Sequence, residues 1–440
     1  MRALVVTIWV FINLIFFGMC GYMYVLWSQY WMYIEKDVYA TTNNYEQQIY
    51  SYNRGLPLND TSKSDHSHKS NNTKHHSTRD VDNVTIIKNA RPRFPNLQGD
   101  DFVLDTQKYT CLFNDSTNEC DSKIKQYKEK ILNELKRVFM DEGNVLKSGL
   151  DNQNPYNVQY KGARENHLNK DREVLMCEFK KVNVSTARRT QEPFSRNVFK
   201  DFIPKRDFLE NKKYKTCAIV ASSGSLVNSR LGHFIDNHDV VLRFNHAPTD
   251  GHQLDVGRKT TIRILNSQVV SKERFKFLES KIYRNITILA WDPSNYTSTL
   301  EEWYQHPEHD LFPNYLTFRR RNPKTKVYLL NPKSLWNLWD FLQHNSPSRL
   351  RRNPPSSGFL GLAVLLPHCD IVNMFEYMPS KRVTKKCHYY DTEDNPACTF
   401  GVWHPLAAEK LLAYSLNTAN DKAVFHNGYL TIPGFDKVSC

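Results

Sequence analysis

Apolar positions divide this chain into three parts. Residues 3–27 form a run without a single charged side chain. Residues 28–107 are rich in Tyr, Asn, Ser, Thr, His and Lys and contain no long apolar run. From about residue 214 onward, short β-branched runs alternate with segments in which apolar residues recur at helical spacing. We therefore expect an apolar segment, a polar segment and a folded domain, in that order.

The alternating part opens with a strand, turn, helix, strand pattern. Residues 218–221 are small and apolar, and a Ser-Ser-Gly-Ser turn follows at 222–225. Residues 226–239 have helical spacing, and a second β-branched run begins at Val240. The turn of such a unit directs N–H groups to the C-terminal edge of a parallel sheet, where nucleotide phosphates usually bind. The glycine pattern leaves nucleotide binding and a plain α/β turn both open, because no G-x-G-x-x-G or G-K-[ST] is present.

The same alternation continues to the end of the chain and is preceded by a helix. Residues 121–137 carry Ile124, Tyr127, Ile131, Leu132 and Leu135 on one face, which is typical of a packing helix. Further strands are expected at 260–265, 286–291, 326–330 and 371–377, and further helices at 300–304, 335–343 and 358–366. Alternation of this kind predicts an α/β fold with a mostly parallel central sheet flanked by helices on both faces.

The apolar segment at 3–27 is long enough to cross a membrane. As a helix it would measure about 37 Å, and aromatic residues crowd its far end, as at a membrane interface. A cleaved signal peptide is the alternative, but it would be shorter and end at a small-residue cleavage site. We expect a signal-anchor at 3–27 with a cytoplasmic stub at 1–2, a flexible luminal stem at 28–107 and a luminal domain at 108–440.

Sequons and cysteines agree with a luminal, oxidising compartment. Eight of the nine cysteines remain when Cys20 in the apolar segment is set aside, an even number that suits complete pairing. No C-x-x-C occurs, which disfavours zinc, and the stem histidines suit a solvated polar tract better than a metal site. N-glycosylation is expected at the N-x-[ST] sequons of Asn59, Asn71, Asn83, Asn114, Asn183, Asn285 and Asn295.

The formal net charge of +13 admits several kinds of anionic partner. Nucleic acid is one, but a luminal protein does not meet it. A scattered, solvated basic surface is the simplest interpretation. Attraction of a small phosphorylated substrate is the functional one.

Four blocks of the chain together resemble the motifs of eukaryotic sialyltransferases, in the order found in that family. Residues 217–268, from Cys-Ala-Ile-Val-Ala-Ser-Ser-Gly to Asn-Ser-Gln, resemble the large sialylmotif. Residues 353–370, beginning Asn-Pro-Pro-Ser-Ser-Gly, resemble the small motif. His388-Tyr-Tyr-Asp391 resembles the third motif, and His404-x-x-x-x-Glu409 the very small motif. Sequence between the motifs, such as Trp291-Asp-Pro-Ser294, is most similar to the β-galactoside α-2,6-sialyltransferases.

This resemblance implies a fold, a reaction and a location. The fold would be a single-domain, Rossmann-like glycosyltransferase, a variant of the GT-A type. The reaction would be inverting, metal-independent transfer of sialic acid from CMP-sialic acid to the 6-hydroxyl of a terminal galactose or N-acetylgalactosamine on glycoprotein glycans. No cofactor is expected, because no Asp-x-Asp lies where a nucleotide-bound metal would need it. The protein would lie in the Golgi membrane as a type II protein, act on galactose-terminated N-glycans and bind no nucleic acid; a homodimer is left open.

The resemblance also assigns roles to individual residues. His404 would be the general base, and His388 would face the departing phosphate, although some α-2,6 members have Tyr there. Local pattern alone leaves Ser356 open as either a helix N-cap or part of an anion site. Familiar members of the family have Tyr directly before the catalytic His, whereas this chain has Trp403, so its preference among acceptors is left open. Donor contacts are implied for Ser222, Asn245, Asn266, Ser356, Ser357, Gly358, Thr399 and Glu409, and acceptor contacts for Gln268, Asp292, Trp403 and Lys410.

Disulfide pairing is implied by the resemblance as well, since eight cysteines alone allow 105 connectivities. The family pattern selects Cys217–Cys369, Cys387–Cys398 and Cys177–Cys440, and the remaining Cys111 and Cys120 are left to pair locally. Three other functions stay open beside the α-2,6 enzyme: an α-2,3-sialyltransferase, a catalytically inactive membrane-anchored glycan-binding protein, and a structural protein whose motifs serve folding.

Overall fold

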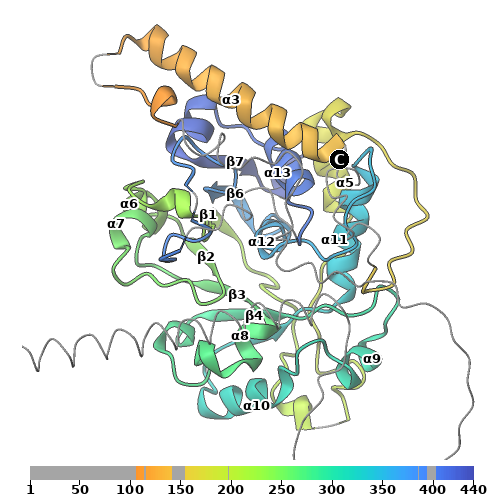
Figure 1. The fold of residues 1–440 in the computed structure, drawn as a ribbon. Coiled ribbons are helices and arrows are strands. Elements are labelled where there is room, and N and C mark those ends of the chain that lie inside the picture. The colour runs from red at the N-terminus through yellow and green to blue at the C-terminus, as the bar shows by residue number, and fades with distance from the viewer. Residues whose placement is uncertain (1–105, 113–114, 141–153, 197, 385, 394–402) are drawn as a thin grey trace, which may run out of the picture. The chain divides into compact units, whose positions relative to one another are not determined.

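Seven strands form one sheet in the computed structural model, which describes residues 106–112, 115–140, 154–196, 198–384, 386–393 and 403–440 (Figure 1). The strand order is β5-β4-β3-β2-β1-β6-β7, and β1 to β6 pair in parallel while β7 runs antiparallel to β6. The predicted α/β fold with a mostly parallel sheet is therefore confirmed. The strands are β1 Tyr214–Val220, β2 Val240–Phe244, β3 Ile262–Asn266, β4 Thr287–Trp291, β5 Val327–Leu329, β6 Cys369–Phe375 and β7 Tyr429–Pro433.

Both faces of the sheet are covered, as the alternation predicts. Helix α12 packs on one face, where its Gly361 lies against Phe244 and Leu242 of β2. Because α12 is apolar all round, it is buried on every side. The opposite face of β3 and β4 packs in a second core, with Val269 of α8 and Tyr315 of α10. The α-helices are α3 Thr117–Met140, α5 Arg172–Lys180, α6 Gly232–Asp236, α7 Gln253–Val256, α8 Ser267–Ser271, α9 Leu300–Gln305, α10 Phe312–Arg321, α11 Lys333–His344, α12 Ser357–Leu365 and α13 Leu406–Ser415.

The long helix α3 confirms the amphipathic segment expected at 121–137. It lies along α13 and buries its apolar stripe, including Ile124, Tyr127 and Leu135 (Figure 1). Short helical turns connect the remaining elements. They are η1 Thr106–Tyr109, η2 His167–Asn169, η3 Val198–Asp201, η4 Gly224–Leu226, η5 Glu273–Phe275, η6 Lys281–Tyr283, the π-helical η8 Lys422–Asn427 and η9 Phe435–Lys437.

The prediction of a helix at 226–239 is wrong for most of that range. Only the turn η4 and the five-residue α6 are helical there. Asn228 and Arg230 have φ values of 62° and 54°, which a right-handed helix does not allow. The Asp255 carboxylate accepts hydrogen bonds from both of their N–H groups, at 2.9 Å each, so a distant residue stabilises the irregular backbone.

Three disulfides have both partners within the described chain, and two of them join distant parts of it. Cys177 is bonded to Cys440, Cys217 to Cys369 and Cys111 to Cys120, which are pairs named from the sequence. Cys387 is also disulfide-bonded, but Cys398, its expected partner, lies outside the described residues.

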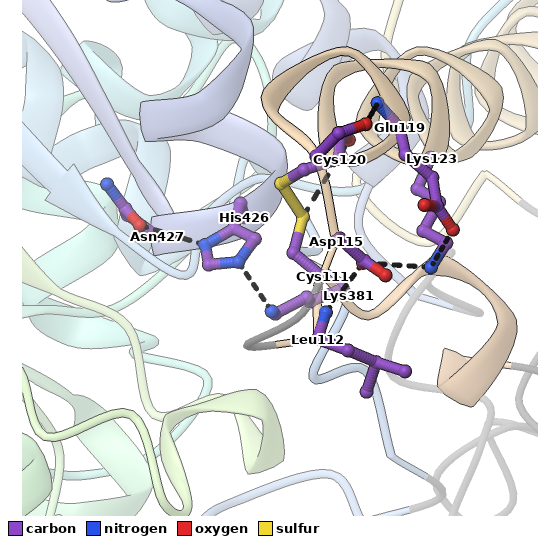
Figure 2. Close-up of a disulfide and its surroundings, with 10 residues drawn as sticks. Cys111, Leu112, Asp115, Glu119, Cys120, Lys123, Lys381, His426 and Asn427 are labelled. Carbon is purple, nitrogen blue, oxygen red and sulfur yellow. Dashed lines mark hydrogen bonds and ion pairs between the residues drawn. A yellow bond between two sulfur atoms is a disulfide. The ribbon is translucent and has the colours of Figure 1, made fainter.

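The disulfide between Cys111 and the first turn of α3 closes a small loop that is held by polar contacts. Figure 2 shows Cys111–Cys120 beside Asp115, whose carboxylate accepts from the N–H of Leu112 at 2.6 Å and from Lys123 at 2.8 Å. Lys381 and His426 lie in the same view and are joined through their side-chain nitrogens at 2.7 Å. The loop fixes the start of α3 against the domain that carries the sheet.

Several predictions fall partly or wholly outside the described residues. The expected signal-anchor, nearly all of the stem, Thr399, and the sequons of Asn59, Asn71, Asn83 and Asn114 lie there. The described part of the chain contains no helix with both the length and the apolar character needed to cross a bilayer. The three remaining sequon asparagines, Asn183, Asn285 and Asn295, are exposed, as glycosylation requires.

Candidate active site

The predicted site residues of the large motif lie where parallel strands end. Ser222 follows β1, Asn245 follows β2, Asn266 ends β3 and Asp292 follows β4. Strand order reverses at β1, which has β2 on one side and β6 on the other. Ligands of open α/β sheets bind beside the carboxyl ends of the strands at such a reversal. The fold therefore brings these residues to the edge at which a nucleotide would bind.

Asn245 is held in an unusual conformation by its neighbours. Its φ is 48°, in the left-handed region that asparagine tolerates better than most residues. Its Oδ1 accepts from the N–H of Asn266 at 3.1 Å, which leaves the Nδ2 group of Asn245 to meet a ligand. Buried Arg263 donates to the carbonyls of Asn245 and Ala247, at 2.8 and 3.0 Å, and so fixes the turn. Asn266 itself caps α8 through the N–H of Val269.

The third motif pairs directly with the loop after β1. The N–H of Gly224 donates to the carbonyl of Cys387 at 3.2 Å, and that of Tyr389 to the carbonyl of Ser222 at 3.0 Å. A Cβ atom at Gly224 would overlap the carbonyl oxygen of Lys386, so this close approach requires glycine. The two motifs, more than 160 residues apart in sequence, thus form one wall of the site.

His388 projects from that wall with three defined neighbours, the first of which is Cys387, whose Sγ lies 3.7 Å from Nε2 of His388. Nδ1 of His388 lies 2.8 Å from Oδ2 of Asp391, and the same oxygen accepts from the backbone N–H of His388 at 2.9 Å. The His388 ring stacks on Tyr390, with centroids 5.0 Å apart and 7° between the planes. The ring is partly exposed, so it can reach a ligand while its orientation stays fixed.

The small motif opens α12 through a buried carboxylate network. Ser356 caps the helix by accepting from the N–H of Phe359, and Glu409 accepts from both the backbone N–H and the hydroxyl of Ser356. Glu409 also accepts from the Tyr377 hydroxyl at 2.9 Å. Ser356 is therefore an N-cap here, and Glu409 joins the small motif to the very small motif.

Ser357 and Gly358 form the first turn of α12. The Ser357 hydroxyl accepts from Nε1 of Trp291 at 3.0 Å, a contact that the sequence did not suggest. A Cβ at Gly358 would press on the ring of Tyr377. Within an α-helix the N–H groups of these first positions have no internal acceptor. With the dipole of a nine-residue helix behind them, they are suited to an anion.

We expect Glu409→Gln to destabilise the protein by about 1–3 kcal/mol, because the amide places a donor against the Ser356 and Tyr377 donors. Chemical unfolding of parent and variant would measure this loss. Glu134→Gln is the matched control, since Glu134 pairs with Arg137 on the partly exposed face of α3. Equal stability of the Glu409 and Glu134 variants would contradict the role given to the network.

His404 lies at the mouth of α13, fixed by the small motif. Its Nδ1 donates to the carbonyl of Pro354 at 2.8 Å, and Asn353 donates to the carbonyl of Trp403 at 2.8 Å. Pro405 is the N-cap residue, directly before the first turn of α13. Burial lowers the pKa of His404 to about 4, opposed by the Pro354 carbonyl and helped by the charge of Arg351. The neutral ring with Nδ1 protonated leaves Nε2 as a base.

The four residues expected to contact an acceptor have different surroundings. Gln268 and Trp403 are half-buried at the edge of the site. Asp292 is fully buried and accepts from Nε1 of Trp303 and from two backbone N–H groups, and burial raises its pKa to about 6. Lys410 is buried as well and donates to the carbonyl of Tyr377 at 2.6 Å, and burial lowers its pKa to about 8. These contacts make Asp292 and Lys410 part of the internal support of the site.

Basic residues before the third motif also have internal roles. Arg382 pairs with the buried Glu376 and donates to the carbonyls of Ser225, His426 and Asn427. It therefore ties the loop after β1 to the C-terminal segment. No sequence signal separated Arg382 from the other basic residues that precede the third motif.

Two groups in the described part of the chain place potential metal ligands close together. The first consists of Cys387, His388 and Asp391, but Cys387 is disulfide-bonded and offers no thiolate. The second consists of Glu165, Glu178 and His344, where the Lys170 ammonium already lies within 2.8 Å of both carboxylates. Neither donor set is suited to a catalytic metal.

Comparison with known proteins relates most of this domain to one family. The model of glycosyltransferase family 29 (sialyltransferase) matches residues 163–420. The chain is 41% identical over 292 residues to beta-galactoside alpha-2,6-sialyltransferase 2 of Danio rerio, covering 66% of the chain and 56% of that relative. It is 43% identical over 289 residues to beta-galactoside alpha-2,6-sialyltransferase 1 of Homo sapiens, covering 65% of the chain and 71% of that relative. The chain thus spans little more than half the length of the first of these relatives.

Among solved structures, the chain aligns with one described as the crystal structure of a mammalian sialyltransferase. Identity is 18% and the TM-score 0.35, covering 58% of this chain and 86% of that one. A second structure of a mammalian sialyltransferase, in complex with Gal-beta-1-3GalNAc-ortho-nitrophenol, aligns with 19% identity and a TM-score of 0.33, covering the same shares. Scores at this level are too low to compare the sites.

Proposed function

The chain belongs to glycosyltransferase family 29, the sialyltransferases, and we propose that it transfers sialic acid from CMP-sialic acid to the 6-hydroxyl of galactose. Family membership supports the donor, and the names of the most similar relatives support the α-2,6 linkage. The observation that carries the proposal is the position of the His404 imidazole. Its Nδ1 donates to the carbonyl of Pro354, which lies just before the N-terminus of α12, where free N–H groups can bind an anion.

In the proposed reaction, one bond forms as another breaks. The galactose 6-hydroxyl oxygen bonds to the anomeric carbon of sialic acid, and its proton passes to Nε2 of His404. The bond between that carbon and the phosphate oxygen breaks on the opposite face, and its electron pair leaves with CMP, so configuration inverts. The N–H groups of Ser357 and Gly358 and the ring of His388 would stabilise the charge that develops on the phosphate.

Ser222, Asn245 and Asn266 would contact the nucleotide, and Gln268 and Trp403 the acceptor. Trp403 presents its ring edge-on to His404, with centroids 4.5 Å apart, so a sugar stacked on the indole would bring a hydroxyl near the base. We include in this proposal the signal-anchor at 3–27, the stem at 28–107, the catalytic domain at 108–440 and a Golgi location. Exposed sequon asparagines and disulfides support a luminal position of the domain.

The test is to incubate the purified full-length protein with CMP-sialic acid and N-acetyllactosamine and to determine the linkage of the product. An α-2,6-linked product supports the proposal. An α-2,3-linked product would show that the protein is a sialyltransferase of the other linkage and that the proposed α-2,6 linkage is wrong. CMP binding without turnover would favour an inactive glycan-binding protein.

We further expect the enzyme to keep most of its activity in excess EDTA. The leaving-group charge would be met by helix N–H groups and an imidazole, and the sequence has no Asp-x-Asp in the place where a nucleotide-bound cation would need it. The assay compares initial rates of transfer before and after chelation. Loss of most activity, restored by added manganese or magnesium, would refute the metal-free mechanism.

A further inference from the structure

Asp391 contacts His388 in a way that determines which hydrogen-bond donors the ring can offer. Its Oδ2 lies 2.8 Å from Nδ1, so the carboxylate accepts the Nδ1 proton. A neutral ring protonated at Nδ1 has a bare lone pair on Nε2, whose protein neighbour is the weakly polar Sγ of Cys387 at 3.7 Å. Such a ring would present an acceptor to a phosphate, which is itself an acceptor. His388 can therefore donate toward the phosphate only when both ring nitrogens carry protons.

The same oxygen also holds the backbone of His388. It accepts from the N–H of His388 at 2.9 Å, which fixes the carboxylate relative to the ring. The stacked Tyr390 ring prevents rotation on the other side. The ion pair is partly exposed, with 39% of the His388 and 28% of the Asp391 side chain accessible, so the pair lies at the surface of the site where a ligand can reach it.

Apart from Asp391, the charged groups near His388 are basic and disfavour protonation of its imidazole. His246, from the segment after β2, lies edge-on to Tyr390, and its own pKa is lowered by burial and then by the charge of His388. Arg263 and Arg274 add positive charge around His246, and exposed Lys386 precedes the motif. The loop after β1 pairs with the His388 segment through the backbone of the uncharged residues Ser222 and Ser223. Asp391 is thus the carboxylate that offsets this positive surrounding.

We propose that Asp391 is a positioning residue that keeps His388 as an imidazolium, so that Nε2–H is donated to the phosphate of the departing CMP. This rests on the proposed function. The two histidines of the site then have opposite states for a physical reason. His404, bonded to a neutral carbonyl and half-buried, stays neutral and accepts a proton. His388, bonded to a carboxylate and partly exposed, stays charged and donates.

The first test measures kcat against pH for the parent, Asp391→Asn and His388→Gln. The amide of Asp391→Asn can still accept from the His388 N–H, so the loop should remain folded. We expect its kcat to fall about 10- to 100-fold at neutral pH, and the deficit to shrink as the pH falls, because solvent then protonates His388 without help. His388→Gln should lose kcat without recovery at acidic pH. A deficit of Asp391→Asn that stays constant with pH would overturn the proposal, as it would indicate a merely structural role.

The second test does not depend on turnover. NMR titration of the histidine ring protons, with His388 assigned by its loss in His388→Gln, should show His388 losing its proton at lower pH in Asp391→Asn than in the parent. Glu134→Gln, which removes a carboxylate from an ion pair on α3, should leave that titration unchanged. An unchanged His388 titration in Asp391→Asn would refute the role of Asp391. An inactive parent with the shifted titration would instead refute the proposed transfer reaction alone.

Discussion

Replacing His404 with alanine should lower kcat by about 10²–10⁴-fold, the usual contribution of a general base. The imidazole is fixed by its hydrogen bond to Pro354 and lies at the mouth of α13, with Nε2 left to accept a proton. Alanine removes the base but none of the groups of the large and small motifs that would hold the nucleotide. CMP affinity should therefore stay near that of the parent while turnover is lost.

His344→Ala is a matched control for this variant. Its Nδ1 also lies against a backbone carbonyl, that of Ala163, but at the end of α11. The His344→Ala variant should have a kcat close to that of the parent. A His404→Ala protein that binds CMP, melts near the parent and still keeps more than about a tenth of the parental kcat would show that another group is the base.

The pH dependence of the parent gives the same prediction a second measurement. Burial holds the pKa of His404 at about 4, below its ordinary 6.5, so the neutral, working form persists into acid. At pH 5.5 about nine-tenths or more of His404 should be neutral, whereas an unshifted histidine would be about one-tenth neutral. We expect the acid limb of kcat to lie near pH 4. A limb near 6.5 would mean that His404 is hydrated in the working enzyme or is not the base.

The strands were predictable from sequence because their signal is local. β2 and β3 are β-branched runs buried on both faces, and such runs stand out against polar turns. β7 was not predicted. It is an edge strand with alternate residues half-buried and a proline at its end, so its pattern resembles that of a loop.

The contacts that assemble the site were not predictable in the same way. The motifs indicated that Ser356, Glu409 and His404 belong together, but not that Glu409 holds the cap of α12 or that Pro354 holds His404. These contacts join residues about 50 apart, and their geometry depends on how α12 and α13 pack. The irregular backbone at Asn228 could not be predicted for the same reason, because the carboxylate of Asp255, from α7, stabilises it.

The disulfide Cys217–Cys369 should contribute more to stability than Cys111–Cys120, which closes a much shorter loop. It joins buried residues of β1 and β6, the two strands at which the sheet order reverses, across 152 residues of chain. Fixing two points so far apart removes much of the entropy of the unfolded chain. The chain-entropy relation gives about 5 kcal/mol for this closure, against about 2.6 kcal/mol for the nine-residue separation of Cys111 and Cys120.

The expected result is therefore a larger loss of unfolding free energy for the double variant Cys217→Ala, Cys369→Ala than for Cys111→Ala, Cys120→Ala, by about 2.5 kcal/mol. Guanidinium unfolding of the full-length protein under non-reducing conditions would measure both, and peptide mapping of the parent should recover the Cys217–Cys369 pair. Alanine suits the two buried positions, so little new strain is introduced. Because β1 and β6 end beside Ser222 and Tyr377, variant protein that remains folded in the cold should still bind CMP. Equal losses for the two double variants, or free thiols at both positions in active protein, would contradict this account of what joins the two halves of the site.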